Sequence, residues 1–285
     1  MNSRANPKTV QALLKEHGIG IKKKYGQNFL IDDNILTKIV DAAAITPDDV
    51  VVEIGPGLGG LTQHLLPRAK RLVAYEIDKH LIPTLESHFG GPSFHLIHDD
   101  VLKRDLDKDI ERFAPGADDV IVVANLPYYI TTPILMRCLE SSKRIKRMVV
   151  MMQHEVAKRI TATPGIKDYN SLSIAVQYRA KATYLFKVSK SVFIPAPAVD
   201  SAVVRLDFHD THRARVEDEA FFFAFVRAAF KQRRKTLLNN LHEFLALDKA
   251  DINAQLHAEG IEGSRRADTV TLNDFIRLAE VFNDA

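Results

Sequence analysis

The sequence is poor in residues that cross-link a chain or bind a metal. Its 285 residues include a single cysteine, Cys138, which excludes an internal disulfide framework and a cysteine-based zinc site. Cys138 lies in the apolar pattern of residues 134–139, so we expect an inert thiol in the core. The 11 histidines show no spacing that suits a set of metal ligands. We therefore predict no metal site.

Long apolar runs and a large excess of one charge are also missing. No apolar stretch is long enough to span a bilayer, and residues 1–7 are polar and lack the apolar core of a signal peptide. We therefore expect a cytoplasmic protein that binds no membrane.

The formal net charge is only +3, so any surface for nucleic acid must be local. With 46% hydrophobic residues, the chain can form one large and one small domain.

Strand-like apolar runs alternate with helical patterns up to residue 208. This alternation predicts a Rossmann-like α/β fold, with a mainly parallel sheet covered by helices on both faces. The runs lie at residues 50–54, 72–76, 94–98, 120–124, 148–152, 183–188 and 202–208. No strong helical pattern joins the last two runs, so we expect an antiparallel pair at the sheet's edge. Residues 209–215 read as a polar linker, which predicts domains at 1–208 and 209–285, the second of them helical.

The tetrapeptide Asn125-Leu126-Pro127-Tyr128 closes the fourth apolar run and is the most informative motif. Proline cannot continue a sheet ladder, so the run delivers an amide, a fixed kink and an aromatic ring to a strand end. An amide oxygen accepts a hydrogen bond from the amino group of a purine, and an aromatic ring stacks on its face. Enzymes that methylate exocyclic nitrogens of bases use an Asn/Asp-x-Pro-aromatic motif of this kind. The alternative interpretation is an ordinary strand end followed by a turn.

A second motif joins the first apolar run to a helical segment at residues 61–66. The turn between them is Gly55-Pro56-Gly57-Leu58-Gly59-Gly60. Glycines let the backbone approach a nucleotide closely, and Glu76, at the end of the next run, is placed to accept hydrogen bonds from ribose hydroxyls. The loop alone fits both NAD and S-adenosylmethionine.

Polar side chains at successive strand ends favour S-adenosylmethionine. Glu53 precedes the first glycine by two positions, where a carboxylate can organise the loop around a cationic sulfonium. Asp99 and Asp100 follow the third run, where a carboxylate can accept from the amino group of adenine. Because carboxyl ends of parallel strands share one sheet edge, we expect these groups and Asn125 to line one cleft. Each carboxylate alone is more typical of a solvated loop.

Motifs along nearly the whole chain make it similar to the small-subunit rRNA adenine N6,N6-dimethyltransferases, the family associated with kasugamycin sensitivity in bacteria. They recur in the family's order and approximate spacing, at residues 26–30, 53–59, 76, 100, 125–128, 193–201 and 232–237. The resemblance implies a class I S-adenosylmethionine-dependent methyltransferase domain and a small helical domain. It also implies dimethylation of two adjacent adenosines in a hairpin loop near the 3′ end of 16S rRNA. The expected substrate is the small ribosomal subunit or its precursor, and the expected enzyme is a monomer.

The resemblance also assigns residues to each part of the site. The residues implied to bind S-adenosylmethionine are Gln27, Asn28, Leu30, Glu53, Gly55, Gly57, Glu76, Ile77, Asp100, Val101 and Asn125. Those implied to act on the target adenine are Asn125, Leu126, Pro127, Tyr128 and Phe193. The rings of Tyr128 and Phe193 would stack on the base.

Local basic clusters are candidates for phosphate contacts. Two of them are Lys22, Lys23 and Lys24, before the first motif, and Arg144, Lys146 and Arg147, after a predicted helix. A third places Arg227, Lys231, Arg234 and Lys235 on one predicted helical face, next to Arg233. Charge runs are usually solvated surface. Because these clusters occur in the same chain as a base-methylation motif, we expect them to contact RNA.

Three departures from the family pattern affect the predicted RNA contacts. Tyr129 stands where Asn is usual, Ala198 replaces a common Lys, and residues 165–171 carry Asn and Ser where Gly and a long side chain are frequent. Other functions stay open: a large-subunit rRNA methylase of the macrolide-resistance type, an assembly factor with secondary catalysis, and an NAD oxidoreductase. Leu126 and the basic helical tail favour the small-subunit enzyme, and the oxidoreductase lacks an evident hydride-transfer residue.

Overall fold

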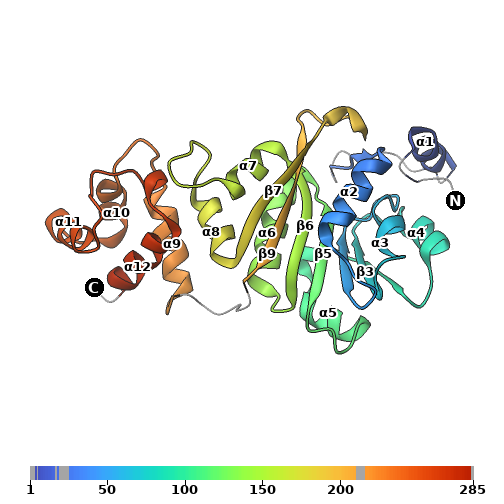
Figure 1. Cartoon of the computed structure of the whole chain (residues 1–285), viewed down its shortest axis with the longest axis horizontal. Helices are drawn as coiled ribbons and strands as arrows, with labels where there is room; N and C mark the ends of the chain where they lie inside the picture. The colour runs from blue at the N-terminus through green and yellow to red at the C-terminus, as the bar shows by residue number, and fades with distance from the viewer. Residues whose placement is uncertain (1–3, 5, 17, 19–25, 210–215, 284–285) are drawn as a thin grey trace. The chain divides into compact units, whose positions relative to one another are not determined.

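The chain divides into two compact units, each of which is described by itself (Figure 1). The computed structural model describes residues 4, 6–16, 18, 26–209 and 216–283. The first unit comprises Met1–Ala157 and Thr183–Asp210, and the second comprises Lys158–Ala182 and Thr211–Ala285. This division corrects the predicted boundary, which placed residues 158–182 in the first domain. Tyr169 and Tyr178 of that segment are buried in the apolar core of the second unit, so the segment folds with it.

The first unit is built on a seven-stranded sheet with the strand order β4-β3-β2-β5-β6-β9-β7. Its strands are β2 (Val50–Ile54), β3 (Arg71–Glu76), β4 (Phe94–His98), β5 (Val120–Asn125), β6 (Ile145–Gln153), β7 (Ala180–Val188) and β9 (Ser201–Phe208). The strands from β4 to β6 pair in parallel, and β9 runs antiparallel to β6. The predicted mainly parallel α/β sheet is therefore confirmed.

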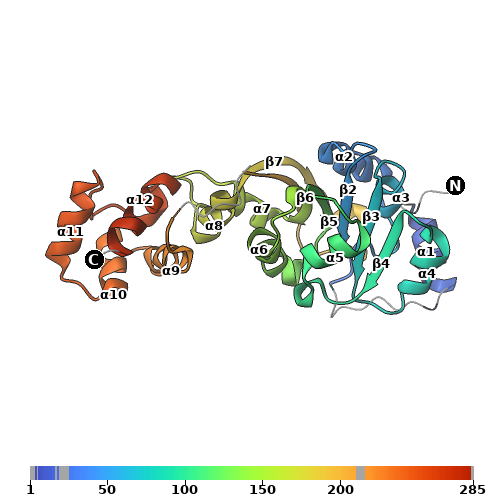
Figure 2. The same ribbon diagram turned by 90° about the horizontal axis from the view of Figure 1, so that it is seen from below.

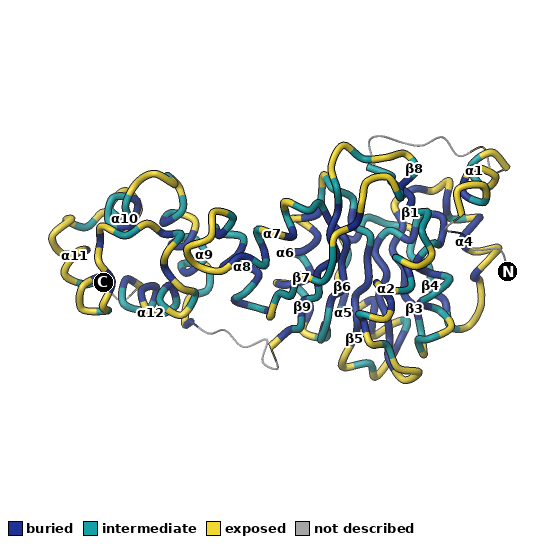
Figure 3. Tube along the Cα trace, turned by 45° about the horizontal axis from the view of Figure 1, so that its top comes forward, coloured by how far each residue is buried: buried dark blue, intermediate teal, exposed yellow. Residues whose placement is uncertain are grey.

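Helices cover both faces of this sheet, because successive side chains of a strand point in opposite directions. Ile121 of β5 belongs to the same apolar cluster as Ile39 of α2. Tyr75 of β3 faces the other way, and its hydroxyl donates a hydrogen bond to Asp109 of α5 (3.1 Å). Figure 3 shows the central strands buried along most of their length. The helices of this unit, seen from below in Figure 2, are α1 (Pro7–Glu16), α2 (Asp33–Ala43), α3 (Thr62–Leu65), α4 (Ile82–Phe89), α5 (Leu106–Phe113) and α6 (Thr131–Ser141).

A small antiparallel sheet joins two of the sequence motifs. It pairs β1 (Phe29–Leu30) with β8 (Phe193–Ile194), and Leu30 lies opposite Phe193. Short 3-10 helices follow several strands, namely η2 (Val101–Lys103), η3 (Tyr128–Ile130) and η4 (Lys190–Val192). Within the parts of the chain that the structure describes, no helix has both the length and the apolar character needed to cross a membrane.

The second unit is helical around an aromatic core. Phe222, Phe225 and Phe275 are fully buried there. Helix α7 (His154–Thr161) leads into this unit from β6. The other helices are α8 (Ser171–Arg179), α9 (Glu219–Ala229), α10 (Leu237–Leu245), α11 (Lys249–Ala258), α12 (Leu272–Asn283) and the 3-10 helix η5 (Ala267–Thr269). The predicted helical character of the C-terminal region is confirmed.

The predicted continuous helix through the third basic cluster is wrong. Helix α9 ends at Ala229, and α10 begins only at Leu237. Asn240, a residue of α10 that is 1% exposed, reaches back to this connection, and its Nδ2 donates to the carbonyls of Ala229 (2.8 Å) and Gln232 (3.2 Å). Its Oδ1 accepts from the Gln232 N–H (3.2 Å). The Asn240 side chain thus forms hydrogen bonds with backbone groups that, in a longer helix, would pair with other backbone groups of that helix. Residues 231–236 form a turn instead.

Candidate functional site

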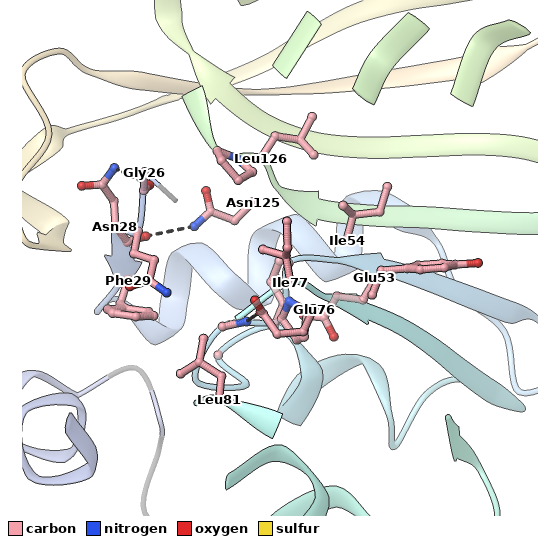
Figure 4. Close-up of a pocket in the computed structure, with 18 of the residues that line it drawn as sticks. Gly26, Asn28, Phe29, Glu53, Ile54, Glu76, Ile77, Leu81, Asn125 and Leu126 are labelled. Atoms are coloured by element: carbon pink, nitrogen blue, oxygen red, sulfur yellow. Dashed lines mark hydrogen bonds between the residues drawn. The ribbon is translucent and has the colours of Figure 1, made fainter. Parts of the chain in front are cut away.

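One pocket lies at the carboxyl ends of four neighbouring strands, β4, β3, β2 and β5 (Figure 4). In that spatial order, the strand ends supply Asp100, Glu76, Glu53 and Asn125. This edge is where ligands bind in open α/β sheets. The structure brings together every residue predicted to contact the cofactor: Gln27, Asn28, Leu30, Glu53, Gly55, Gly57, Glu76, Ile77, Asp100, Val101 and Asn125.

Glu53 carries a buried carboxylate with one unsatisfied oxygen. The residue is 1% exposed, and its Oε2 accepts a hydrogen bond from the Thr62 hydroxyl (2.7 Å). Its Oε1 has no hydrogen-bond partner among the described residues. Burial raises the pKa of Glu53 to about 8, because the charged form loses its hydration. A buried acceptor on a pocket wall is a place where a positively charged or donor group of a ligand would fit.

Glu76 is held by the glycine loop. Its Oε2 accepts from the Gly57 N–H (3.1 Å), and its Oε1 accepts from the Asp78 N–H (2.8 Å). Burial raises the pKa of Glu76 despite these two donors. Gly57 has a φ of +60°, and a Cβ at this position would lie 3.3 Å from the ring of Phe29. The loop therefore needs glycine here for its backbone conformation and for its close approach to β1.

The amide of Asn125 is fixed in one orientation. Its Nδ2 donates to the carbonyl of Asn28 (3.2 Å), as Figure 4 shows, so its Oδ1 is left to act as an acceptor in the pocket. The next residue, Leu126, donates its N–H to the carbonyl of Met151 in β6 (3.0 Å). Hydrogen bonds therefore fix both the side chain of Asn125 and the backbone of the residue that follows it.

Tyr128 also lines the pocket, with its ring anchored at the far end. Its hydroxyl lies 2.5 Å from the hydroxyl of Ser201, at the start of β9. Burial raises the pKa of Tyr128, so the phenol stays neutral and available for this hydrogen bond.

The structure does not bring Phe193 into the pocket. Its ring is 3% exposed and belongs to the apolar core of the first unit. Its backbone pairs with Leu30, which does line the pocket. This corrects the prediction that Phe193 stacks on the base: the ring is enclosed by the core, and the residue positions the β1 segment instead.

Several pocket residues were missed by the sequence analysis. Arg4 is 6% exposed, donates from Nη1 to the carbonyl of Leu58 (2.8 Å), and has its guanidinium 5.2 Å from the centre of the Phe89 ring. Arg4 lies in a polar stretch of the sequence without hydrophobic periodicity, so no local pattern predicts that its side chain is buried at the pocket. Phe29 lies inside the motif at residues 26–30 but was not itself assigned to the pocket, whereas Asp99, which the sequence analysis placed at this edge with Asp100, does line it. Within the described residues, no group of three or more His, Cys, Asp or Glu side chains is arranged to hold a metal ion.

The second predicted RNA-binding cluster is paired inside the first unit. The ion pairs are Arg144 with Glu111 (2.8 Å), Lys146 with Asp49 (2.6 Å) and Arg147 with Asp207 (2.6 Å). These residues lie at the start of β6, while the pocket lies at the carboxyl ends of the strands. Both facts argue against phosphate contacts and favour a role in stabilising the fold. The first cluster, Lys22, Lys23 and Lys24, lies outside the described residues.

The third cluster is only partly neutralised by its surroundings. Lys231 and Lys235 both form ion pairs with Glu243, at 3.1 and 2.9 Å. Arg233 donates to the carbonyl of Lys167. Arg227 and Arg234 are exposed and form no ion pair within the described part of the chain. Helix α9 ends at Ala229, so only Arg227 of this cluster lies on a helix. The turn after the helix carries the other four residues, Lys231, Arg233, Arg234 and Lys235.

A family model described as ribosomal RNA adenine dimethylase matches residues 19–284. The chain belongs to this family. It is 47% identical over 285 residues to the ribosomal RNA small subunit methyltransferase A of Bacillus pumilus, covering 99% of this chain and 98% of the relative. It is 49% identical over 280 residues to the protein of the same name from Lysinibacillus sphaericus, covering 97% and 96%.

Solved structures of similar proteins agree with this family. A dimethyladenosine transferase from Plasmodium falciparum has a TM-score of 0.75 and 28% identity, covering 90% of this chain and 97% of that one. The 23S rRNA methyltransferase ErmE has a TM-score of 0.68 and 26% identity, covering 90% and 100%. Membership of a methyl-transferring family makes the NAD oxidoreductase interpretation wrong.

Proposed function

We propose that the chain transfers methyl groups from S-adenosylmethionine to N6 of two adjacent adenosines in a hairpin loop near the 3′ end of 16S rRNA. Its substrate is the small ribosomal subunit or its precursor, in the cytoplasm. The observation that carries this proposal is the Asn125 amide, which is tied to Asn28 through Nδ2 and keeps Oδ1 in the pocket. Relatives 47–49% identical and named for the small subunit favour this substrate over the large subunit.

The pocket residues fit S-adenosylmethionine. Each oxygen of Glu76 keeps a second acceptor position for a ribose hydroxyl, beyond its backbone N–H donor. Asp100 accepts the Leu102 N–H on Oδ1 (3.0 Å), which leaves Oδ2 for an adenine amino group. The unsatisfied Oε1 of Glu53 suits the positively charged end of the molecule. When bound, the sulfonium supplies an electrophilic methyl group.

Asn125 prepares the nitrogen that accepts the methyl group. The lone pair of an adenine amino group is delocalised into the ring, which makes the nitrogen a poor nucleophile. Accepting its two hydrogens, on the Asn125 Oδ1 and a main-chain carbonyl of the tetrapeptide, favours a pyramidal nitrogen with an available lone pair. After transfer, the alkylated amine is acidic and loses its proton to water, so the chain needs no general base.

Orientation is the second contribution of these residues. Tyr128, anchored through Ser201, offers a ring on which the target base stacks. Holding two reactants in line can lower a barrier by about 7–11 kcal/mol. The target base must leave its stack to reach the pocket, so an unpaired loop costs less than a duplex.

Replacement of Asn125 by Ala tests the proposal. Because the variant lacks the acceptor oxygen, we expect its methyl transfer to fall by about 100-fold or more, by analogy with the loss of one preorganised polar group. Binding to the small subunit should survive, since the phosphate contacts are elsewhere. Transfer of a tritiated methyl group to immature small subunits measures activity, and sedimentation with the subunits measures binding. Asn34→Ala, at an exposed position of α2, is the matched control.

Other outcomes of this experiment contradict particular parts of the proposal. An active Asn125→Ala enzyme would show that the amide is not the N6 acceptor. Label that maps to large-subunit rRNA would favour the macrolide-resistance type of reaction. Binding to the subunit by the wild-type protein, with no transfer at all, would leave an assembly factor without catalysis.

A further inference from the structure

Tyr129 is an exposed aromatic residue at the edge of the pocket. It is 54% exposed, although it lines the same pocket as Asn125. A large ring exposed singly on a surface needs no explanation, but a ring exposed at the edge of a pocket is placed to contact a molecule that enters it.

Tyr128 and Tyr129 point in different directions. They are consecutive residues of the 3-10 helix η3, in which three residues make one turn, so their side chains leave the axis about 120° apart. The contacts agree with this geometry. The hydroxyl of Tyr128 reaches Ser201 of β9, whereas the ring of Tyr129 packs beside Gly26. The two rings therefore cannot both stack on one base in the same way.

The position of the Tyr129 ring is well fixed. A Cβ on Gly26 would lie 3.1 Å from Cδ1 and 3.4 Å from Cε1 of this ring, so one ring edge rests on the glycine backbone. Gly26 has a φ of +59°, a conformation that favours glycine. The backbone around the ring is held as well, because the carbonyl of Pro127 accepts from the Ile130 N–H (3.2 Å) and the Thr131 hydroxyl (3.0 Å). An aromatic ring held in place in this way loses little conformational entropy when a flat ligand stacks on it.

We propose that Tyr129 stacks on the base of the nucleotide next to the target adenosine, so that this neighbour stays at the pocket's edge while the target enters. The inference rests on the proposed function. When one base is extruded, its neighbour loses a stacking partner, and an aromatic side chain at the right place replaces that partner. Such a ring tolerates either base identity, because every base has a π-face. Tyr129 is therefore a positioning residue for the substrate, distinct from the groups that touch N6.

A double-mutant cycle between the ring and the neighbouring base tests the proposal. The protein variants are Tyr129→Leu, which keeps apolar packing on Gly26 but removes the aromatic face, and the conservative Tyr129→Phe. The RNAs are the hairpin with both adenosines and the same hairpin with an abasic site at the neighbour. On the intact hairpin, we expect Tyr129→Leu to raise the KM for RNA about 5- to 150-fold, the range for one lost base–aromatic stack. Tyr129→Phe should stay within about threefold of the wild type.

The abasic hairpin separates stacking from packing. If the ring acts on the base, Tyr129→Leu adds no further loss on this RNA, and the cycle shows coupling. Equal losses on both RNAs would overturn the proposal and assign the ring to packing against Gly26. An independent measurement uses the wild-type protein and 2-aminopurine at the neighbouring position, whose fluorescence should fall in the complex; unchanged fluorescence would also overturn it.

Failure of the proposed function would look different. In that case, the wild-type protein would transfer no methyl group to the intact hairpin or to immature small subunits, whatever the cycle shows. An active wild-type enzyme with no coupling between Tyr129 and the base would remove this inference alone.

Discussion

Replacing Glu53 with Gln removes an ionisable carboxyl group from the wall of the pocket while keeping the size and shape of the side chain. The amide oxygen of Gln can still accept the hydrogen bond from Thr62, which lies 2.7 Å from Oε2 in the wild type. Its amide nitrogen takes the place of Oε1, which has no partner among the described residues. The substitution therefore isolates the cost of holding a charge at this buried position.

The pH dependence of that cost follows from the two pKa values of the group. The ordinary value is 4.5, and burial raises the pKa in the folded protein to about 8. Between these values, the folded state binds more protons than the unfolded state, so wild-type stability falls as the pH rises. One pKa unit corresponds to about 1.4 kcal/mol, so the penalty grows from about 1 kcal/mol at pH 5 to about 5 kcal/mol at pH 9. We expect the stability advantage of Glu53→Gln to increase by about 4 kcal/mol over this range.

Urea unfolding at several pH values between 5 and 9 measures this difference, with the free energy of unfolding taken by linear extrapolation. Glu140→Gln, at an exposed position of α6, is the control for the chemical change alone. Its stability relative to the wild type should not depend on pH. If the difference between Glu53→Gln and the wild type is also flat, the carboxyl is not held neutral by burial, and the reasoning about the pocket is refuted.

Two further predictions concern the second unit. Asn240→Leu should lower the free energy of unfolding by about 3 kcal/mol, because it leaves buried backbone groups without partners; a loss below about 1 kcal/mol in urea unfolding would contradict the role of this amide. The double substitution Arg227→Gln/Arg234→Gln should reduce the slope of log affinity for RNA against log salt by about 1–2. The matched pair Lys231→Gln/Lys235→Gln should change it less, since a shared glutamate already pairs with both lysines; equal effects would show that all four act alike.

The sheet could be predicted because its strands are buried on both faces. A strand such as β5 must then be apolar along its length, so it is visible in the sequence as a continuous run. The placement of the polar residues follows from the same topology. Parallel strands all end at one edge, and Glu53, Glu76 and Asn125 stand at or near their strand ends. Spacing along the chain was therefore enough to predict that they share a pocket.

The errors arise where contacts distant in sequence decide the outcome. The end of α9 depends on Asn240, which lies 11 residues beyond the Ala229 carbonyl that it caps. Phe193 is enclosed because β8 pairs with β1, a contact between segments more than 160 residues apart along the chain. In the sequence alone, the basic residues at the start of β6 suggest an RNA-binding surface. In the fold, they form ion pairs with Asp49, Glu111 and Asp207. In each case, the local pattern was read correctly, and a distant partner changed its meaning.

The pocket also explains why an amide suits position 125 better than a carboxylate. Glu53 already places an acidic group on the adjacent strand, and Glu76 raises the pKa of Glu53 further by repulsion between like charges. A carboxylate at position 125 would add to this repulsion and could not donate to the Asn28 carbonyl, as the Asn125 Nδ2 does. Under the proposed function, the amide would supply an acceptor for the amino group of adenine without adding charge. Under the proposed function, the acidic groups would face the positively charged donor molecule, and the neutral amide would face the neutral base.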